Sequence, residues 1–211
     1  MPDSLNDSIR RHLADNIWIY LIVIFSFILG ISLGALAVNN IDEAAKTDAI
    51  IYLEGFLDLT NQNQLQSEAI LKQSIKYNFY YAMILFFSGA VYIGIIVIPM
   101  LVAFRGFCIG FSIAFLTKNV GSNGFLLSLG SVLPQNLIFV PVIIVMGVTG
   151  FNYSLWALRY KYFKKSAVVP RIFAAYALSM LVLFILLVAG SIVEAYITSL
   201  IVRAIVPYIK Y

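Results

Sequence analysis

The residues that could do chemistry in this chain stand inside apolar runs. Pro134, Gln135 and Asn136 lie together at the centre of the apolar run 124–150. A proline removes a backbone donor, and two side-chain amides need hydrogen-bond partners that lipid does not supply. The motif therefore requires protein partners or a wet cavity. Two interpretations satisfy it: a proline kink whose amides bind neighbouring helices, or a solute site on a broken helix, as in many transporters.

Two charged residues adjoin other apolar runs. Arg105 is interpreted as an anchor near the cytoplasmic interface, where its long side chain reaches the lipid headgroups. A translocation charge is the alternative. Glu194 could pair with Arg203, cap the C-terminal helix or contact a partner protein. In a permease or channel subunit, Arg105 and Glu194 would line a polar path together with the two amides of the central motif.

The sequence offers few residues for conventional catalysis. A hydrolase uses a nucleophile with its base, paired carboxylates or a metal cluster. The one histidine, His12, lies in the polar N-terminal segment, and the one cysteine, Cys108, lies in an apolar helix. The acids of residues 42–68 are interpreted as solvated charge, and no G-x-G-x-x-G or P-loop string occurs. We expect a non-enzymatic protein without a cofactor or a bound metal.

The composition places the chain in the membrane. Of its 211 residues 62% are hydrophobic and only 11% are charged, whereas soluble domains carry about 25% charged residues. The formal charge of +4 comes without a Lys/Arg run of the kind that binds nucleic acid. We assign this charge to topology and lipid headgroups, and we expect no nucleic-acid partner. The class is an all-α polytopic membrane protein.

The first half of the chain predicts three transmembrane helices. Residues 17–38 carry no charge and, at about 1.5 Å per residue, match the thickness of a bilayer core. Between Lys76 and Arg105 the chain is again uncharged and is too long for one untilted span. Because proline interrupts helices, the sequence predicts helices at about 77–98 and 100–117, with the break at Pro99.

Small residues recur at four-residue spacing in two of these spans, a pattern that lets helix backbones approach closely. Gly30 and Gly34 follow Ser26 in the first span, and Gly106 and Gly110 lie in the third. We interpret the glycines as helix-packing positions. For the first pair, packing within the monomer and a homodimer seam both remain open.

Residues 40–76 form the largest segment outside the predicted spans and carry six acids against three lysines. Leu53, Phe56 and Leu57 fall on one side of a helix, so a short amphipathic helix at the membrane surface is predicted there. We take this face as a candidate partner surface. The segment is an extracytoplasmic helical insertion, too small for a conventional catalytic domain.

The second half of the chain sets the topology. The basic segment 159–171 belongs in the cytoplasm by the positive-inside rule, together with the N-terminal segment 1–16. Residues 119–158 then cross once with a re-entrant or broken half near Pro134; two crossings are the alternative. A last span at about 172–192 precedes an interfacial helix at 195–211. Residues 17–211 thus form one membrane domain of about five transmembrane helices plus interfacial amphipathic helices, with the N-terminus inside and the C-terminus outside.

Four strings resemble the stage II sporulation protein M family in the same order and at similar spacing. They are GFLLSLGSVLPQNLIFVP, the preceding FRGFCIGFSIAFL, Val38-Asn39 at the end of the first helix, and Glu194-Ala195-Tyr196 after the last one. The resemblance implies a bacterial membrane subunit of the sporulation engulfment machinery. It further implies assembly with stage II sporulation proteins D and P, which degrade peptidoglycan, in the engulfing septal membrane of the mother cell.

Two functions from different classes follow. The first is a non-enzymatic scaffold that recruits and anchors these partners, so that their concentration near peptidoglycan rises. The second is a small permease or channel subunit that uses the Pro134–Asn136 region. The sequence does not tell whether the chain forms a homodimer.

Overall fold

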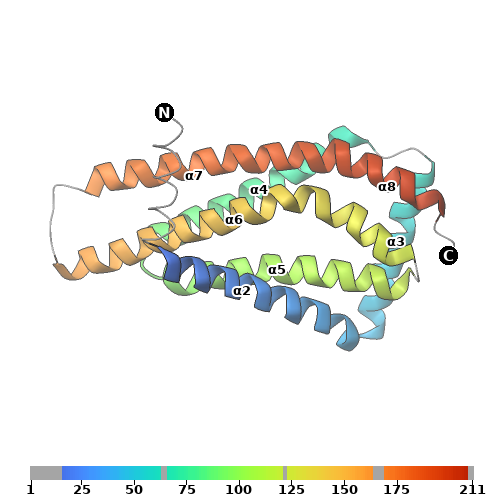
Figure 1. Ribbon diagram of the computed structural model, residues 1–211, viewed down its shortest axis with the longest axis horizontal. Helices are drawn as coiled ribbons and strands as arrows, with labels where there is room; N and C mark the ends of the chain where they lie inside the picture. Colours follow the sequence, from blue (N-terminus) through green and yellow to red (C-terminus); the bar gives the residue numbers. More distant parts are fainter. Residues whose placement is uncertain (1–15, 63–65, 121–122, 164–168, 209–211) are drawn as a thin grey trace.

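The computed structural model describes residues 16–62, 66–120, 123–163 and 169–208, and it is helical throughout these ranges apart from short turns (Figure 1). Six long helices are joined to shorter helical pieces, of which η3 is a π-helix and η1 and η4 are 3-10 helices. In chain order the elements are α2 (Ile17–Ala37), η1 (Val38–Asn40), α3 (Glu43–Asn61), α4 (Ser67–Ala90), α5 (Gly94–Asn119), α6 (Gly124–Phe163), α7 (Val169–Ile192), η3 (Val193–Thr198), α8 (Ser199–Ile205) and η4 (Val206–Tyr208).

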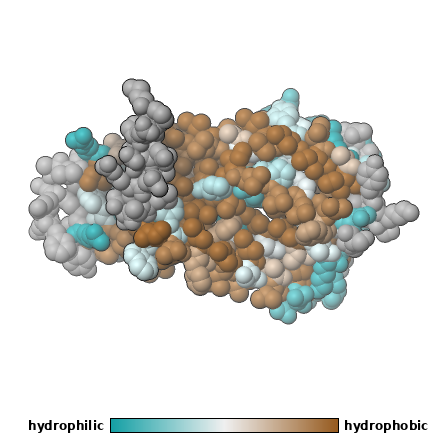
Figure 2. Space-filling model, viewed as in Figure 1, coloured by the Kyte–Doolittle hydropathy of each residue, from teal (hydrophilic) through white to brown (hydrophobic). Residues whose placement is uncertain are grey.

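The surface of this bundle is that of a membrane protein. Figure 2 shows a broad hydrophobic band over the middle of the molecule, with hydrophilic residues gathered toward its two ends. Within the described ranges, four helical stretches are long and apolar enough to cross a membrane: 17–40, 94–119, 124–159 and 171–205. The predicted all-α polytopic membrane fold is therefore confirmed. The charged first half of α4 keeps it out of this set, although α4 packs beside α6 and α7.

Five of the long helices, α2, α4, α5, α6 and α7, run along the bundle and alternate in direction (Figure 1). α2 and α5 lie side by side on one flank, α6 occupies the middle, and α4 and α7 form the other flank. The core is centred on α6, where Phe139, Ile143 and Met146 are buried. α3 crosses the end of the bundle at which α8 also lies. The start of α2, the turn 91–93, the end of α6 and the start of α7 lie at the opposite end.

The break between α4 and α5 is not at the predicted position. Pro99 lies inside α5, and the chain turns instead at residues 91–93. A side chain at Gly94 would collide with the backbone of Ser88, so glycine permits the close approach that this turn requires. The Ser154 hydroxyl donates to the Val91 carbonyl at 2.7 Å and ties the turn to α6. Pro99 lies in the second turn of α5, where the helix loses a single backbone hydrogen bond.

α6 is not broken near Pro134, contrary to the prediction. It runs without interruption for 40 residues and contains both Pro134 and Pro141. At about 1.5 Å per residue it is about 60 Å long, so it passes the whole bundle once without a re-entrant half. Side-chain amides support the turn that precedes Pro134, as described below.

Two further boundaries differ from the prediction. α4 begins at Ser67 and continues past Lys76, so the second part of the insertion 40–76 belongs to the bundle. The C-terminal segment is not a separate interfacial helix, because α7 continues through η3 directly into α8. The apolar residues Ile197 and Leu200 are 51% and 71% exposed, while Thr198 is buried. In lipid the apolar stripe of a helix can face outward and its small polar stripe can pack inside.

Candidate functional site

A polar cavity of about 180 Å³ lies between α5, α6 and η3. The four polar residues that the sequence singled out for a possible path, Arg105, Gln135, Asn136 and Glu194, all line it. They come from three separate parts of the chain. The remaining lining residues are Cys108, Ile109 and Ser112 of α5 and Val132 and Phe139 of α6.

The α6 wall of the cavity follows from Pro134. The Gln135 side-chain N–H donates to the Ser131 carbonyl at 2.6 Å, and that of Asn136 donates to the Val132 carbonyl at 2.7 Å. Proline displaces the carbonyls of the preceding turn, and these two amides bind carbonyls in that turn. The Asn136 side-chain oxygen is buried and has no hydrogen-bond partner among the described residues. It is an acceptor on the cavity wall.

Gln135 also joins α6 to the C-terminal segment. Its side-chain oxygen accepts a hydrogen bond from the Thr198 hydroxyl at 2.7 Å, and both residues are buried. Buried polar groups in a membrane protein are satisfied by such interhelical bonds. The amide of Gln135 is therefore used at both ends, whereas the amide of Asn136 keeps an acceptor free.

Arg105 lies inside the bundle and not at the cytoplasmic interface where it was predicted. Because α5 starts at Gly94, Arg105 is eleven residues (105 − 94) from one end of the helix and fourteen (119 − 105) from the other, or about 17 and 21 Å. Its guanidinium carbon is 5.9 Å from the ring centre of Tyr81 and 5.5 Å from that of Phe139. These cation–π contacts stabilise the charge in an apolar setting.

No anion among the described residues accepts a hydrogen bond from Arg105. Its Nε is buried without a hydrogen-bond partner in the described part of the chain. Glu194 lines the same cavity, yet no ion pair within 4.0 Å joins the two residues. A guanidinium offers five donors and favours carboxylates and phosphates. The cavity can therefore accept an anionic or strongly hydrogen-bonding group.

The half-buried Glu194 belongs to a polar cluster whose other members, Ser74, Asn78 and Ser191, are buried. The Ser74 hydroxyl donates to the Glu194 carboxylate at 2.5 Å. The Asn78 amide donates to the hydroxyl oxygens of Ser191 at 3.0 Å and of Ser74 at 3.3 Å. The Ser191 hydroxyl donates to the Leu187 carbonyl at 3.1 Å. Every hydroxyl proton in the cluster thus has an acceptor, and α4 is joined to the C-terminal helix.

The π-helical segment η3 directs the side chains of Glu194 and Thr198 toward two different helices, α4 and α6. A π-helix has more residues per turn than an α-helix and often marks a functional site. Here it places Glu194 against α4 while Thr198 reaches Gln135 on α6. Ser74, Asn78, Ser191 and Thr198 were not predicted from the sequence. The four-residue spacing of Ser74 and Asn78 was the available signal, but these residues fell partly in the segment assigned to the outer insertion.

The four glycines singled out in the sequence meet at the contact between α2 and α5. A side chain on Gly30 or Gly34 would collide with the backbone of Ala103 or Phe107. A side chain on Gly106 or Gly110 would collide with the backbone of α2. The two helices thus touch through their main chains within one molecule.

The α3 face proposed for partners is turned toward the protein. Leu57 is fully buried in a small cluster with Leu127, Val202 and Val206, and Leu53 and Phe56 pack against that cluster. This face fixes α3 to α6 and α8 and is not free to bind a partner. The outward surface of α3 instead exposes Tyr52, Glu54 and Asp58.

Within the described ranges, no group of three or more His, Cys, Asp and Glu side chains is placed to hold a metal ion. Cys108 is a free thiol and is exposed at the edge of the cavity. His12 lies outside the described residues.

Comparison with family models decides the family. The model described as stage II sporulation protein M matches residues 23–199, which include every wall of the cavity and both glycine pairs. The chain belongs to the stage II sporulation protein M family. No curated protein and no solved structure matches it. Membership in the stage II sporulation protein M family makes the chain a sporulation-related membrane protein, which confirms the resemblance of the four strings.

Proposed function

We propose that the chain is a non-enzymatic membrane scaffold of the engulfment complex. It recruits and anchors peptidoglycan-degrading partners of the D and P types at the septal membrane. The family supplies the sporulation context. The specific role and the partners are an inference from family membership, combined with the shape of the molecule at one end of the bundle.

The observation that carries this proposal is that α3 packs one face against α6 and α8 and exposes the other. The helix is fixed from below by Leu57, which is fully buried, and its other surface exposes Tyr52 (83%) together with Glu54 and Asp58. A rigid platform at the end of a membrane bundle suits the docking of a membrane-anchored partner. Holding two enzymes on one platform raises their effective concentration at the wall.

The charge distribution supports the orientation of this platform. The end of α6, which carries Arg159, and the start of α7, which carries Arg171, lie at one end of the bundle, whereas α3 with its acids lies at the other (Figure 1). By the positive-inside rule, the end with the arginines faces the cytoplasm and α3 faces outward. With α4 counted as a fifth pass beside the four apolar spans, the proposed topology has the N-terminus inside and the C-terminus outside.

The test is co-purification of the full chain with D-type and P-type partners in mild detergent. Glu54→Lys with Asp58→Lys reverses two charges on the exposed surface of α3. We expect this variant to lose at least one partner. A matched control, Asp42→Lys with Glu68→Lys, makes the same charge change at the starts of α3 and α4, where both side chains are exposed. The control should keep its partners.

Two results would count against the scaffold. Retention of both partners by the α3 variant would show that α3 is not the docking surface. If the folded native chain retains no partner at all, recruitment itself is refuted. The thermal unfolding of each variant in detergent separates lost binding from lost folding.

A small permease or channel subunit is the second candidate. One observation favours it: Arg105, Asn136 and Glu194 line one cavity, with a free acceptor on Asn136. Chloride and potassium flux from proteoliposomes tests this function. Flux that falls in Asn136→Leu but not in the exposed-surface variant Glu54→Lys would support it. Native protein that is folded and passes neither ion would contradict it for these ions.

A further inference from the structure

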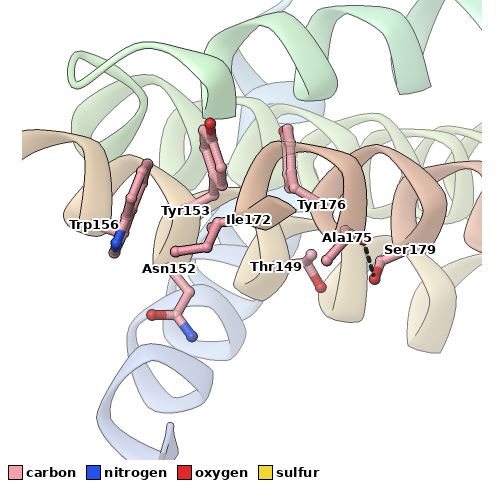
Figure 3. Close-up of a pocket in the computed structure, with 8 residues that line it drawn as sticks. All are labelled: Thr149, Asn152, Tyr153, Trp156, Ile172, Ala175, Tyr176 and Ser179. Atoms are coloured by element: carbon pink, nitrogen blue, oxygen red, sulfur yellow. Dashed lines mark hydrogen bonds between the residues drawn. The ribbon is translucent and has the colours of Figure 1, made fainter. Parts of the chain in front are cut away.

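A second hollow lies on the membrane face of the protein, between α6 and α7. It is a groove of about 320 Å³ whose lining residues come from the last part of α6 and the first part of α7 (Figure 3). Thr149, Asn152, Tyr153 and Trp156 of α6 form one wall, and Ile172, Ala175, Tyr176 and Ser179 of α7 form the other. It shares no residue with the Arg105 cavity.

The floor of this groove is held in place by aromatic rings. Tyr153 and Tyr176 stack with their ring centres 4.3 Å apart, and Figure 3 shows both rings pointing to the same side. The Tyr176 hydroxyl donates to the Phe86 carbonyl of α4 at 2.8 Å. Beside this floor, the Asn152 amide donates to the Asn16 side-chain oxygen at 2.6 Å. The groove is thus a fixed feature of the packing between α2, α4, α6 and α7.

Small residues keep the groove open on the α7 side. Ala175 and Ser179 are exposed and short, and they lie one helical turn apart. The Ser179 hydroxyl donates to the Ala175 carbonyl of its own helix at 2.9 Å (Figure 3). Its proton therefore needs no acceptor from a molecule bound in the groove. An apolar chain can therefore lie against Ile172 and Ala175 without leaving polar groups unpaired.

Two arginines lie just beyond the same end of the groove, Arg159 near the end of α6 and Arg171 near the start of α7. Arg159 follows Trp156 by three residues, and Arg171 precedes Ala175 by four. Residues three and four apart are neighbours on a helix surface, so each arginine lies about one turn beyond a residue that lines the groove. Both arginines are exposed. The groove therefore runs from an apolar part to a cationic end at headgroup depth, with Trp156 at the position typical of an interfacial aromatic belt.

We propose that this groove is a binding site for an anionic phospholipid of the leaflet on the basic side. The lipid phosphate lies between Arg159 and Arg171, and one acyl chain lies along Trp156, Ile172 and Ala175. Basic pockets between transmembrane helices bind anionic headgroups in this way. The proposal is independent of the scaffold and of the permease, because it rests on a separate surface.

Trp156 provides the measurement, since the chain has only two tryptophans. In Trp18→Phe, the full-length protein retains Trp156 as its single fluorophore. The variant is reconstituted in phosphatidylcholine vesicles that contain a small fraction of either brominated phosphatidylglycerol or brominated phosphatidylcholine. Bromine quenches tryptophan on contact. We expect the anionic lipid to quench Trp156 with an apparent affinity about fivefold or more higher, since each basic residue near the surface contributes about fivefold.

The matched control is Trp156→Phe, which leaves Trp18 at the start of α2. Trp18 is 76% exposed and reports ordinary lipid around the protein. It should be quenched equally by both lipids. The preference at Trp156 should disappear in Arg159→Gln with Arg171→Gln, and it should also fall in Ala175→Leu, which fills the groove without changing charge.

Three outcomes would overturn the proposal. Equal quenching of Trp156 by the two brominated lipids would show that the groove does not select anionic lipid. A preference that survives the double arginine substitution would remove the assigned phosphate contacts. Displacement of the lipid by millimolar glycerol phosphate would show that the site binds a soluble phosphate and not a lipid.

Discussion

Two helix contacts hold the bundle together in lipid by opposite means: the contact between α2 and α5, and the contact between α4 and the C-terminal helix. The first has glycines on both helices and brings main chains together. The second buries Ser74, Asn78 and Ser191 in a hydrogen-bonded cluster that also includes the half-buried Glu194. Lipid provides no hydrophobic force between helices, so helices associate by close packing or by polar bonds. This protein uses one device on each flank of α6.

The two contacts therefore tolerate different substitutions: one restricts the size of a side chain, and the other restricts its polarity. At the α2–α5 contact any added atom meets backbone, so side-chain volume is restricted and polarity matters little. At the polar cluster polarity is restricted, because loss of one donor leaves other buried groups unpaired. The Arg105 cavity adjoins the second contact through Glu194. Two buried polar atoms of this cavity, Arg105 Nε and the Asn136 side-chain oxygen, have no hydrogen-bond partner among the described residues.

The largest effect is expected when a glycine at the α2–α5 contact is enlarged. Gly106→Leu should lower the free energy of unfolding by about 3 kcal/mol or more, because overpacking here displaces backbone. The measurement is accumulation of folded protein and its thermal unfolding in detergent. Gly55→Leu is the control, since a side chain at Gly55 meets nothing within 4 Å. Normal levels and full function of Gly106→Leu would refute the packing assignment.

A smaller loss is expected when the polar cluster loses its central donor. Asn78→Leu keeps the volume but removes the hydrogen bonds to Ser74 and Ser191. We expect a destabilisation of about 1–3 kcal/mol, measured by thermal unfolding. Ser32→Ala removes an exposed bond within its own helix and should change stability by less than about 0.5 kcal/mol. Equal effects of the two variants would contradict the role of the cluster.

The bond between Gln135 and Thr198 should show a coupling that single substitutions do not reveal. A double-mutant cycle with Gln135→Leu and Thr198→Val is expected to give an interaction energy of about 1 kcal/mol. Additive effects within about 0.3 kcal/mol would show that the two side chains do not cooperate. The cycle tests whether the Pro134 region is bound to the C-terminal segment.

The smallest effect on stability is expected at Arg105. Arg105→Met removes a charge that has ring contacts but no anion within the described residues. Replacing a buried charge by an apolar side chain of similar length is often neutral or stabilising. We expect an unchanged or higher unfolding temperature. A loss of more than about 2 kcal/mol would show that the cation–π contacts are a structural requirement.

Fold class and family could be predicted from the sequence because each depends on local patterns. Uncharged apolar runs of bilayer length are stable when they span a membrane, because their side chains match the hydrocarbon core in length and polarity. The paired glycines in the first and third spans predicted close packing, and the strings around Pro134 identified the family. Helix ends were predicted less well, because Pro99 was given more weight than the turn at residues 91–93.

The partners of each polar group were decided only by the tertiary structure. Arg105, Asn136 and Glu194 lie far apart in the sequence, and no spacing rule shows that they line one cavity. Ser74 meets Glu194 across 120 positions of the chain. The sequence determines which groups cannot remain in lipid alone, since desolvation acts on each residue separately. It does not determine their partners, because a hydrogen bond depends on distances of about 3 Å that only the packing of whole helices sets.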